Sequence, residues 1–262
     1  MTMLPLIQVD AFADRPFTGN PAAVMPLQHW LSDEILQAIA VENNLSETAF
    51  TIPDATGEAD FELRWFTPGL EIALCGHATL ASGHVLLCDR ERIRFRTRKA
   101  GILEVARDGE SYAMSLPAYP PTPQPLPHLV AGLGAEAVET LWHEGRYALI
   151  VLENEAQVRA LKPDFRVLMN DGDTMTIATA PGETIDVVSR VFVPGAGVDE
   201  DPVTGSAHSV LVPYWAARLG RSDAMTFFQA SKRGGHLTGR LDGDRVILGG
   251  KCVTVLEGLM TI

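Results

Sequence analysis

The sequence predicts an α+β protein made of two duplicated domains, and three repeated features indicate the duplication. An Arg-x-Phe-x-Pro-Gly segment begins at Arg64 and again at Arg190, 126 residues later. A Gly-led segment before an apolar run begins at Gly76 and again at Gly205, and an Asp-Gly pair follows in each half. Because the three features recur in the same order, duplication explains them better than chance does.

The segments that precede these repeated features are also predicted to have the same kinds of secondary structure in both halves. The segments read as a strand, a helix and a second strand, because their apolar residues recur at strand or helix spacing. The first helix opens on a Ser-Asp-Glu N-cap signal. The predicted segments are Leu6–Phe12, Ser32–Asn43 and Thr48–Ile52 in the first half, and Tyr147–Leu152, Asn154–Leu161 and Thr174–Thr179 in the second.

One buried helix then follows in each half, at the apolar runs Leu80–Leu87 and Val210–Leu219. Pro213 falls inside the second run, where a proline should kink the helix or end it early. The Asp-Gly pairs at positions 108 and 242 lie between alternating runs, a pattern typical of β-hairpins.

A proline-rich segment separates the halves, with six prolines between Pro117 and Pro127. Such a composition favours an extended, semi-rigid linker. We therefore expect an N-terminal repeat domain over residues 1–118, a linker over 119–127 and a C-terminal repeat domain over 128–262. The alternative for the segment is a P-x-x-P ligand for a recognition domain.

Composition and charge argue against several classes of protein. The 262 residues are 46% hydrophobic and 21% charged, which is typical of a globular protein with a sizeable core. No apolar stretch approaches the roughly 18–20 residues of a membrane span, and the first residues do not resemble a signal peptide. Three cysteines are too few for a disulfide framework, which favours a cytoplasmic setting.

Partners of two further kinds are not expected. The net charge of −12 argues against nucleic-acid binding. Arginines alternate between Arg90 and Lys99, so we expect them to form the solvated face of a strand. The acidic segments at residues 171–173 and 199–201 lack a calcium-loop pattern and read as turns. We therefore expect neither a metal nor a cofactor.

The two Gly-led helix starts are the first candidates for a binding site. Duplication should bring Gly76 and Gly205 to one cleft between the halves, since ligand sites favour such interfaces. A helix start offers unpaired backbone N–H groups and a partial positive charge, which suit a carboxylate or a developing enolate.

Four side chains near these segments can carry chemistry, and each also has an ordinary structural explanation. Glu47 is flanked by apolar residues and can shuttle protons if it is buried, or it is a surface turn residue. His77 can donate to a substrate oxygen or relay a proton, or it caps and packs. Asp201 precedes a proline, so N-capping explains it fully. Ser206 can be a cap or a small packing residue.

Five motifs resemble those of the phenazine biosynthesis (PhzF-like) family, in the family's order and over essentially the whole chain. They are Phe17-Thr-Gly-Asn20-Pro-Ala-Ala-Val24, Leu45-Ser-Glu47-Thr-Ala-Phe50, Arg64-Trp-Phe-Thr-Pro68, Leu74-Cys-Gly-His77-Ala-Thr79 and Asp199-Glu-Asp201-Pro-Val-Thr-Gly-Ser206-Ala-His208. The resemblance implies the diaminopimelate-epimerase-like fold, in which each of two similar domains is a curved, barrel-like, mostly antiparallel sheet around a central helix. It also implies a homodimer.

The resemblance further implies a reaction and its residues. The phenazine-pathway member isomerises trans-2,3-dihydro-3-hydroxyanthranilate without metal or organic cofactor and moves a proton with one glutamate. By motif, Glu47 is that acid/base, and His77 and Asp201 assist the transfer. The residues implied to bind a small, carboxylate-bearing cyclic substrate are Asn20, Gly76, Gly205 and Ser206.

Two other functions remain open on this sequence. The related epimerases use two cysteines, one per half, but here Thr204 stands where the second half would match Cys75. That difference favours the single-carboxylate reaction over an amino-acid epimerase or racemase. A metabolite-binding protein that does not turn over its ligand is the second alternative.

Overall fold

The structure is a computed structural model that describes residues 1–221 and 223–262. Contacts between its elements divide the chain into two units. The first unit contains Met1–Ser115 and Gly249–Ile262, and the second contains Leu116–Leu248.

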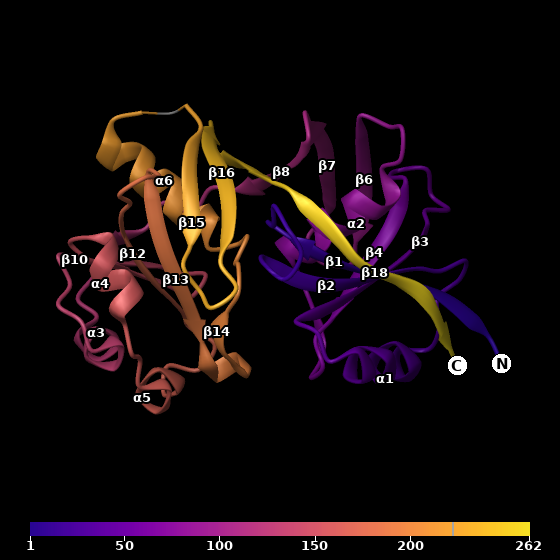
Figure 1. Cartoon of the computed structure of the whole chain (residues 1–262), viewed down its shortest axis with the longest axis horizontal. Coiled ribbons are helices and arrows are strands. Elements are labelled where there is room, and N and C mark those ends of the chain that lie inside the picture. Colours follow the sequence, from indigo (N-terminus) through magenta and orange to yellow (C-terminus); the bar gives the residue numbers. More distant parts are fainter. Residues whose placement is uncertain (222) are drawn as a thin grey trace. The chain divides into compact units, whose positions relative to one another are not determined.

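Strands of the first unit pair mostly in antiparallel fashion (Figure 1). Only β2–β3 and β4–β6 among its described pairs are parallel. Parallel neighbours need a crossover connection, and α1 (Asp33–Asn43) and α2 (Gly76–Leu86) lie in these two crossovers. The strands are β1 (Met3–Ala11), β2 (Asn20–Pro26), β3 (Glu47–Pro53), β4 (Phe61–Phe66), β5 (Glu71–Ile72), β6 (Arg92–Thr97), β7 (Ile102–Asp108), β8 (Ser111–Pro117, which runs into the second unit) and β18 (Cys252–Thr261).

The second unit repeats this order of strands and directions. Its antiparallel pairs are β9–β10, β10–β11, β12–β13, β13–β14 and β15–β16, and β11–β12 and β13–β15 are parallel. The duplication and the α+β class predicted from the sequence are therefore confirmed. The elements are β9 (Thr122–Pro123), α3 (Pro127–Leu133), β10 (Glu139–His143), β11 (Tyr147–Val151), α4 (Glu155–Ala160), α5 (Phe165–Met169), β12 (Met175–Pro181), β13 (Val187–Val193), the 3-10 turn η1 (Pro194–Ala196), β14 (Val198–Asp201), α6 (His208–Leu219), β15 (Met225–Gln229), β16 (Gly235–Asp242) and β17 (Arg245–Gly250).

Each unit contains one buried helix, as predicted. Residues 76–83 of α2 are all buried, and the helix packs against β1, β2, β3, β7 and β18. Residues 208–216 of α6 are buried in the same way, and this helix packs against β11 and β16. A helix that is apolar on all sides belongs in an interior. No helix within the described residues is long and apolar enough to cross a bilayer.

Pro213 lies inside α6 without ending the helix, which continues to Leu219. Because proline has no N–H, the carbonyl of Ser209 four residues earlier loses its helical partner. The backbone N–H of Tyr119 donates to this carbonyl at 2.8 Å. The helix does not end early, because a donor from outside replaces the missing bond.

The two units differ from the predicted domains at two places. β18 pairs with β1 along its length, so residues 249–262 group with the first unit rather than with a domain over 128–262. In Figure 1 the yellow β18 accordingly accompanies the indigo β1. The segment predicted as a linker over 119–127 belongs to the second unit, where β9 pairs with β10.

The Asp-Gly pairs lie at the predicted turns. Gly109 connects β7 and β8, which pair in antiparallel fashion, and its φ is +59°. Gly243 lies between β16 and β17 with a φ of +62°. Glycine is favoured at both because it adopts positive φ without a Cβ clash.

The repeated Arg-x-Phe segments form the same arginine brace in both units. Arg64 donates to the carboxylate of Glu71 at 2.7 and 2.8 Å, and its guanidinium lies 5.0 Å from the ring of the phenylalanine two residues later. Arg190 donates to Glu200 at 2.7 and 2.9 Å, and its guanidinium also lies 5.0 Å from the matching ring. A spacing of two on a strand puts both side chains on one face, which explains the motif.

The arginine-rich segment forms a strand face, as predicted. On β6, Ile93, Phe95 and Thr97 are buried, whereas Arg92 and Arg94 are exposed. Other arginines of the segment pair with carboxylates. The guanidinium of Arg96, for example, lies 2.7 Å from Asp54.

Candidate functional site

The first unit gathers three of the predicted site residues and one cysteine, which we call the glutamate site (Asn20, Glu47, Cys75 and His77). Oε2 of Glu47 lies 2.8 Å from Nε2 of His77. The side-chain amide nitrogen of Asn20 and Sγ of Cys75 lie 3.3 and 3.5 Å from Nδ1 of the same ring. Only 14% of the Glu47 side chain is exposed, so it is not a surface turn residue.

Strand pairing and helix packing create this arrangement. Asn20 opens β2 and Glu47 opens β3, and the parallel register places Ala22 opposite Glu47. Asn20 and Ala22 lie on one face of β2 because strand side chains alternate. α2 packs against both strands and carries His77 as its second residue. The side chain of Cys75, at the N-cap position, makes no capping hydrogen bond, which leaves it facing the imidazole.

The charges within the glutamate site favour an imidazolium beside a carboxylate. Burial acts to lower the pKa of His77, but Cys75 and Glu47 outweigh it and raise that pKa well above its usual value. Burial, reinforced by Glu47, raises the pKa of the Cys75 thiol. Cys75 is therefore a neutral thiol near pH 7. A neutral thiol is a poor nucleophile and base.

The same residues also have the chemistry of metal ligands. Glu47, Cys75 and His77 each offer one ligand atom, and these atoms lie within 4.8 Å of one another. Thiolate, imidazole and carboxylate are all zinc ligands in proteins. The absence of a metal therefore stays a prediction, and a chelator tests it.

The second unit places Asp201, Gly205 and Ser206 in one turn before α6, which we call the serine turn (residues 201–206). The helix begins at His208 with Ala207 as its N-cap. Asp201 is therefore not the N-cap but the last residue of β14, and its carboxylate accepts a hydrogen bond from the Thr204 hydroxyl.

Gln229 holds the serine turn from β15 and was not predicted. Its fully buried amide accepts from the Thr204 N–H at 2.9 Å and donates to the Asp201 carbonyl at 2.8 Å. It also lies 3.2 Å from the Thr204 hydroxyl. Gln229 lies 25 residues after Thr204 and belongs to no motif, so no sequence signal pointed to it.

His208 is a buried, neutral histidine at the start of α6. Its Nδ1–H donates to the Thr204 carbonyl at 2.9 Å, and the ring meets Phe227 edge-on at 5.0 Å. Nε2 is buried and has no hydrogen-bond partner among the described residues. Burial lowers the pKa of His208 to about 4.

Acid should therefore destabilise the fold through His208. Between pH 6.5 and 4 the unfolded chain binds a proton at His208, whereas the folded chain does not. Lowering the pH over this range therefore lowers the free energy of unfolding by on the order of 3 kcal/mol. When the free energy of unfolding is measured by urea titration at several pH values in this range, His208→Gln should lose this part of the pH dependence. The exposed His29 supplies the control, since His29→Gln should keep the wild-type slope. Equal slopes for wild type and His208→Gln would refute the assignment.

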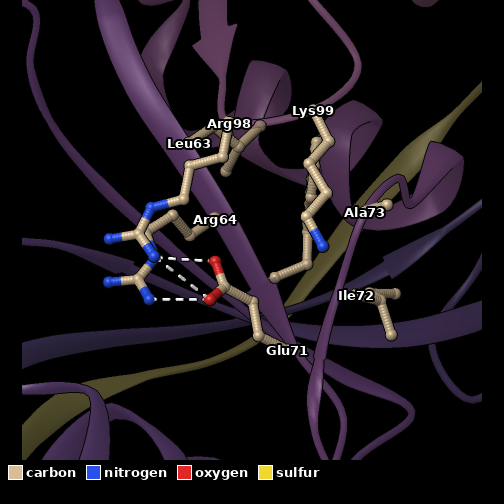
Figure 2. Close-up of a pocket in the computed structure, with 8 residues that line it drawn as sticks. Leu63, Arg64, Glu71, Ile72, Ala73, Arg98 and Lys99 are labelled. Carbon is tan, nitrogen blue, oxygen red and sulfur yellow. Dashed lines mark hydrogen bonds and ion pairs between the residues drawn. The ribbon is translucent and has the colours of Figure 1, made fainter.

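A cavity of about 240 Å³ lies at the arginine brace of the first unit (Figure 2). None of the four glutamate-site residues lines it. The carboxylate of Glu71 lies between two guanidinium groups, which donate to it at 2.7 and 2.8 Å from Arg64 and at 3.3 Å from Arg98. Since this carboxylate is already satisfied by the brace, we assign the cavity no chemistry.

Comparison with known proteins gives the family. Residues 9–258 match the family model described as phenazine biosynthesis-like protein. A Pseudomonas aeruginosa protein named as an uncharacterised isomerase is 49% identical over 256 residues, with 96% of each chain covered. The crystal structure of a PhzF-family protein from Enterococcus faecalis has a TM-score of 0.93 and 42% identity, with 100% of both chains covered.

A more distant structure shares the fold alone. A hydroxyproline epimerase from Agrobacterium vitis has a TM-score of 0.63 at 12% identity, over 98% of this chain and 92% of that one. The resemblance and the epimerase-like fold predicted from five sequence motifs are thus confirmed by the match over nearly the whole chain. The chain belongs to the phenazine biosynthesis-like (PhzF) family.

Proposed function

We propose that the protein is a cofactor-independent isomerase that moves a proton within a small, carboxylate-bearing cyclic substrate, with Glu47 as the acid/base. One observation carries the proposal: a largely buried carboxylate lies 2.8 Å from a buried imidazole. The isomerase name of the Pseudomonas relative supports the reaction class. The closest chemical model is trans-2,3-dihydro-3-hydroxyanthranilate isomerisation.

In the proposed reaction Glu47 takes a proton from a carbon next to an unsaturated system. The electrons of the broken C–H bond enter the conjugated system, a double bond shifts, and the same carboxyl returns the proton to another carbon. The substrate is neither oxidised nor reduced. His77 lies 2.8 Å from the Glu47 carboxylate and fixes its position, and burial limits exchange of the carried proton with water.

The remaining predicted residues have binding roles in this proposal. Gly76 opens α2 without a side-chain cap, so the backbone N–H groups there can hold an oxyanion. We assign Gly205 and Ser206 to carboxylate binding and Asp201 to assisting the transfer. That the glutamate site and the serine turn act on one substrate stays a prediction, as do the homodimer and the cytoplasmic setting.

An amino-acid epimerase is the second candidate, because Cys75 lies 3.5 Å from His77. Three observations weigh against it. The thiol is neutral near pH 7 because burial raises its pKa, and Thr204 stands at the matching place of the second unit. The Thr204 hydroxyl is engaged with Asp201.

Deuterium exchange in heavy water separates the candidates. With trans-2,3-dihydro-3-hydroxyanthranilate we expect product that carries deuterium at the new C–H bond, and Cys75→Ser should change the rate less than about threefold, because no thiol step is involved. An epimerase would instead exchange the α-proton of L-proline or trans-4-hydroxy-L-proline and lose activity in Cys75→Ser. Binding without exchange would indicate a binding protein. Loss of activity after EDTA treatment would contradict the cofactor-free site.

A further inference from the structure

One cysteine of the glutamate site has no part in the proposed proton transfer. Cys75 is buried, and its side chain makes no capping hydrogen bond at the start of α2. Its Sγ instead lies 3.5 Å from Nδ1 and 4.0 Å from Nε2 of His77. Together with Oε2 of Glu47, which lies 2.8 Å from Nε2, these atoms offer a metal ion one sulfur, one nitrogen and one oxygen ligand. No second group of three such side chains comes as close together within the part of the chain that the structure describes.

The spacing of the three ligand atoms suits a tetrahedral zinc ion. Zinc bonds of about 2.0–2.3 Å place neighbouring ligand atoms about 3.3–3.6 Å apart. Sγ and Nε2 must therefore approach, and Oε2 and Nε2 must separate, by roughly 0.5 Å each. Side-chain rotations of that size leave the backbone in place. The ion replaces the proton of the thiol and the proton of Nε2, so it lies between atoms that already face one another.

The surroundings of the three ligands also suit a metal ion. The side-chain amide of Asn20 lies 3.3 Å from Nδ1 of His77, where it can orient the ring as the outer partner of a metal-bound histidine usually does. Oε2 of Glu47 is buried and has no hydrogen-bond partner among the described residues besides the imidazole 2.8 Å away. The Glu47 side chain is 14% exposed, so an ion can enter from solvent.

We propose that Glu47, Cys75 and His77 bind a zinc ion that reversibly inhibits the enzyme and is not its cofactor. The binding stands on the ligand geometry, whereas the inhibition rests on the proposed role of Glu47. On binding, the Cys75 thiol and the His77 imidazolium each release one proton to solvent, and the metal takes the two freed lone pairs and one from the carboxylate. A carboxylate bound to zinc cannot remove a proton from carbon. Water fills the fourth position.

The ligand set selects the class of cation. Thiolate and imidazole suit Zn²⁺, whereas Mg²⁺ takes octahedral sites made of oxygen ligands. A large excess of Mg²⁺ should therefore neither displace zinc nor slow the reaction. Inhibition by Mg²⁺ as strong as that by Zn²⁺ would overturn this selectivity.

Cobalt substitution tests the site without turnover. The whole chain, kept reduced and freed of metal by a chelator, is titrated with Co²⁺ while its absorbance is recorded. We expect an ultraviolet thiolate-to-cobalt charge-transfer band and the visible bands of tetrahedral cobalt, and Zn²⁺ should abolish both. Absence of the charge-transfer band in the wild type would overturn the proposal.

Replacement of the sulfur ligand identifies the site. Cys75→Ser should lose the charge-transfer band and bind zinc at least about tenfold more weakly, because loss of a direct ligand costs no less than loss of an outer partner. Competition with a chromophoric chelator measures the affinity. The exposed Cys88 supplies the matched control, and Cys88→Ser should keep both the band and the affinity. Equal zinc affinity of the wild type and Cys75→Ser would overturn the proposal.

A second variant covers the case in which Cys75→Ser does not fold, as thermal unfolding would show. Glu47→Gln removes the oxygen ligand instead and should also weaken zinc at least about tenfold, because a neutral amide is a poorer ligand than a carboxylate. Unchanged zinc affinity in this variant would exclude Glu47 as a ligand.

Zinc should also slow the deuterium exchange catalysed by the wild type. At saturation we expect a fall of about a hundredfold or more, the loss expected when a general base is blocked. EDTA should then restore the full rate, whereas removal of a zinc cofactor would lower it. Exchange that continues unchanged with zinc bound would overturn the inhibitory role.

The cobalt spectra need no reaction, so the two proposals can fail separately. If Glu47 is not the base, exchange is absent, but the charge-transfer band and its loss in Cys75→Ser remain. If the zinc site is wrong, exchange occurs, but the band is absent and zinc has no effect on the rate.

Discussion

Replacement of Glu47 by glutamine should lower kcat/KM at least a hundredfold, and up to about 10⁴-fold, because an amide cannot accept the proton that a general base removes. Glutamine keeps the length and shape of the side chain beside His77. The measurement follows consumption of trans-2,3-dihydro-3-hydroxyanthranilate by ultraviolet absorbance. The size of the loss in kcat/KM shows which role Glu47 has. If Glu47 only positioned the substrate, the variant would lose one hydrogen bond and kcat/KM would fall by a smaller factor.

A matched control makes this result specific to position. Glu42 is exposed on α1, so Glu42→Gln makes the same chemical change outside the glutamate site and should leave kcat/KM unchanged. Thermal unfolding checks that both variants are folded, since Glu47→Gln also removes one partner of a buried ion pair. A folded Glu47→Gln variant with near wild-type kcat/KM would exclude Glu47 as the base.

Arg64→Met should lower the free energy of unfolding by about 3 kcal/mol, because it leaves Glu71 beside a buried site without its bidentate partner. The Arg64 side chain is only 2% exposed, whereas Glu71 is 29% exposed, so the loss lies at the low end for a broken buried pair. Asp33 also pairs with Arg64 but is largely exposed and adds little. Urea denaturation measures the change.

An exposed arginine on the same sheet provides the comparison. Arg92 is 71% exposed, and its ion pair with Glu104 is long, at 3.9 Å. Arg92→Met should therefore change the free energy of unfolding by less than about 0.5 kcal/mol. The double variant Arg64→Met/Glu71→Met should recover part of the loss, because it leaves no unpaired charge at the site. Equal stability of the Arg64 and Arg92 variants would show that the arginine brace is not structural.

Much of the fold was predictable because duplication makes each half a test of the other. The Arg-x-Phe spacing, the Gly-led helix starts and the Asp-Gly turns are local patterns, and each corresponds to local geometry in both units. The two buried helices followed from their largely apolar sequences. Family resemblance then supplied the candidate residues, and the structure brings Asn20, Glu47 and His77 together.

Other features were not predictable because they depend on pairing between distant segments. No local pattern shows that β18 pairs with β1, so the domain boundary near the C-terminus was misplaced. Asp201 looked like an N-cap because a proline follows it, but the helix begins later, at His208. Gln229 holds the serine turn from another strand, and a lone glutamine carries no signal in the sequence.

The most direct test of the account is the fate of one labelled hydrogen. Substrate deuterated at the carbon that loses its proton is converted in ordinary water in a single turnover, and the product is examined by NMR. A single carboxyl that carries the proton in a shielded site predicts that part of the deuterium reappears at the new C–H bond, and that Glu47→Gln gives no product on the same timescale. Product without any deuterium at that position, formed equally fast by Glu47→Gln, would contradict the account.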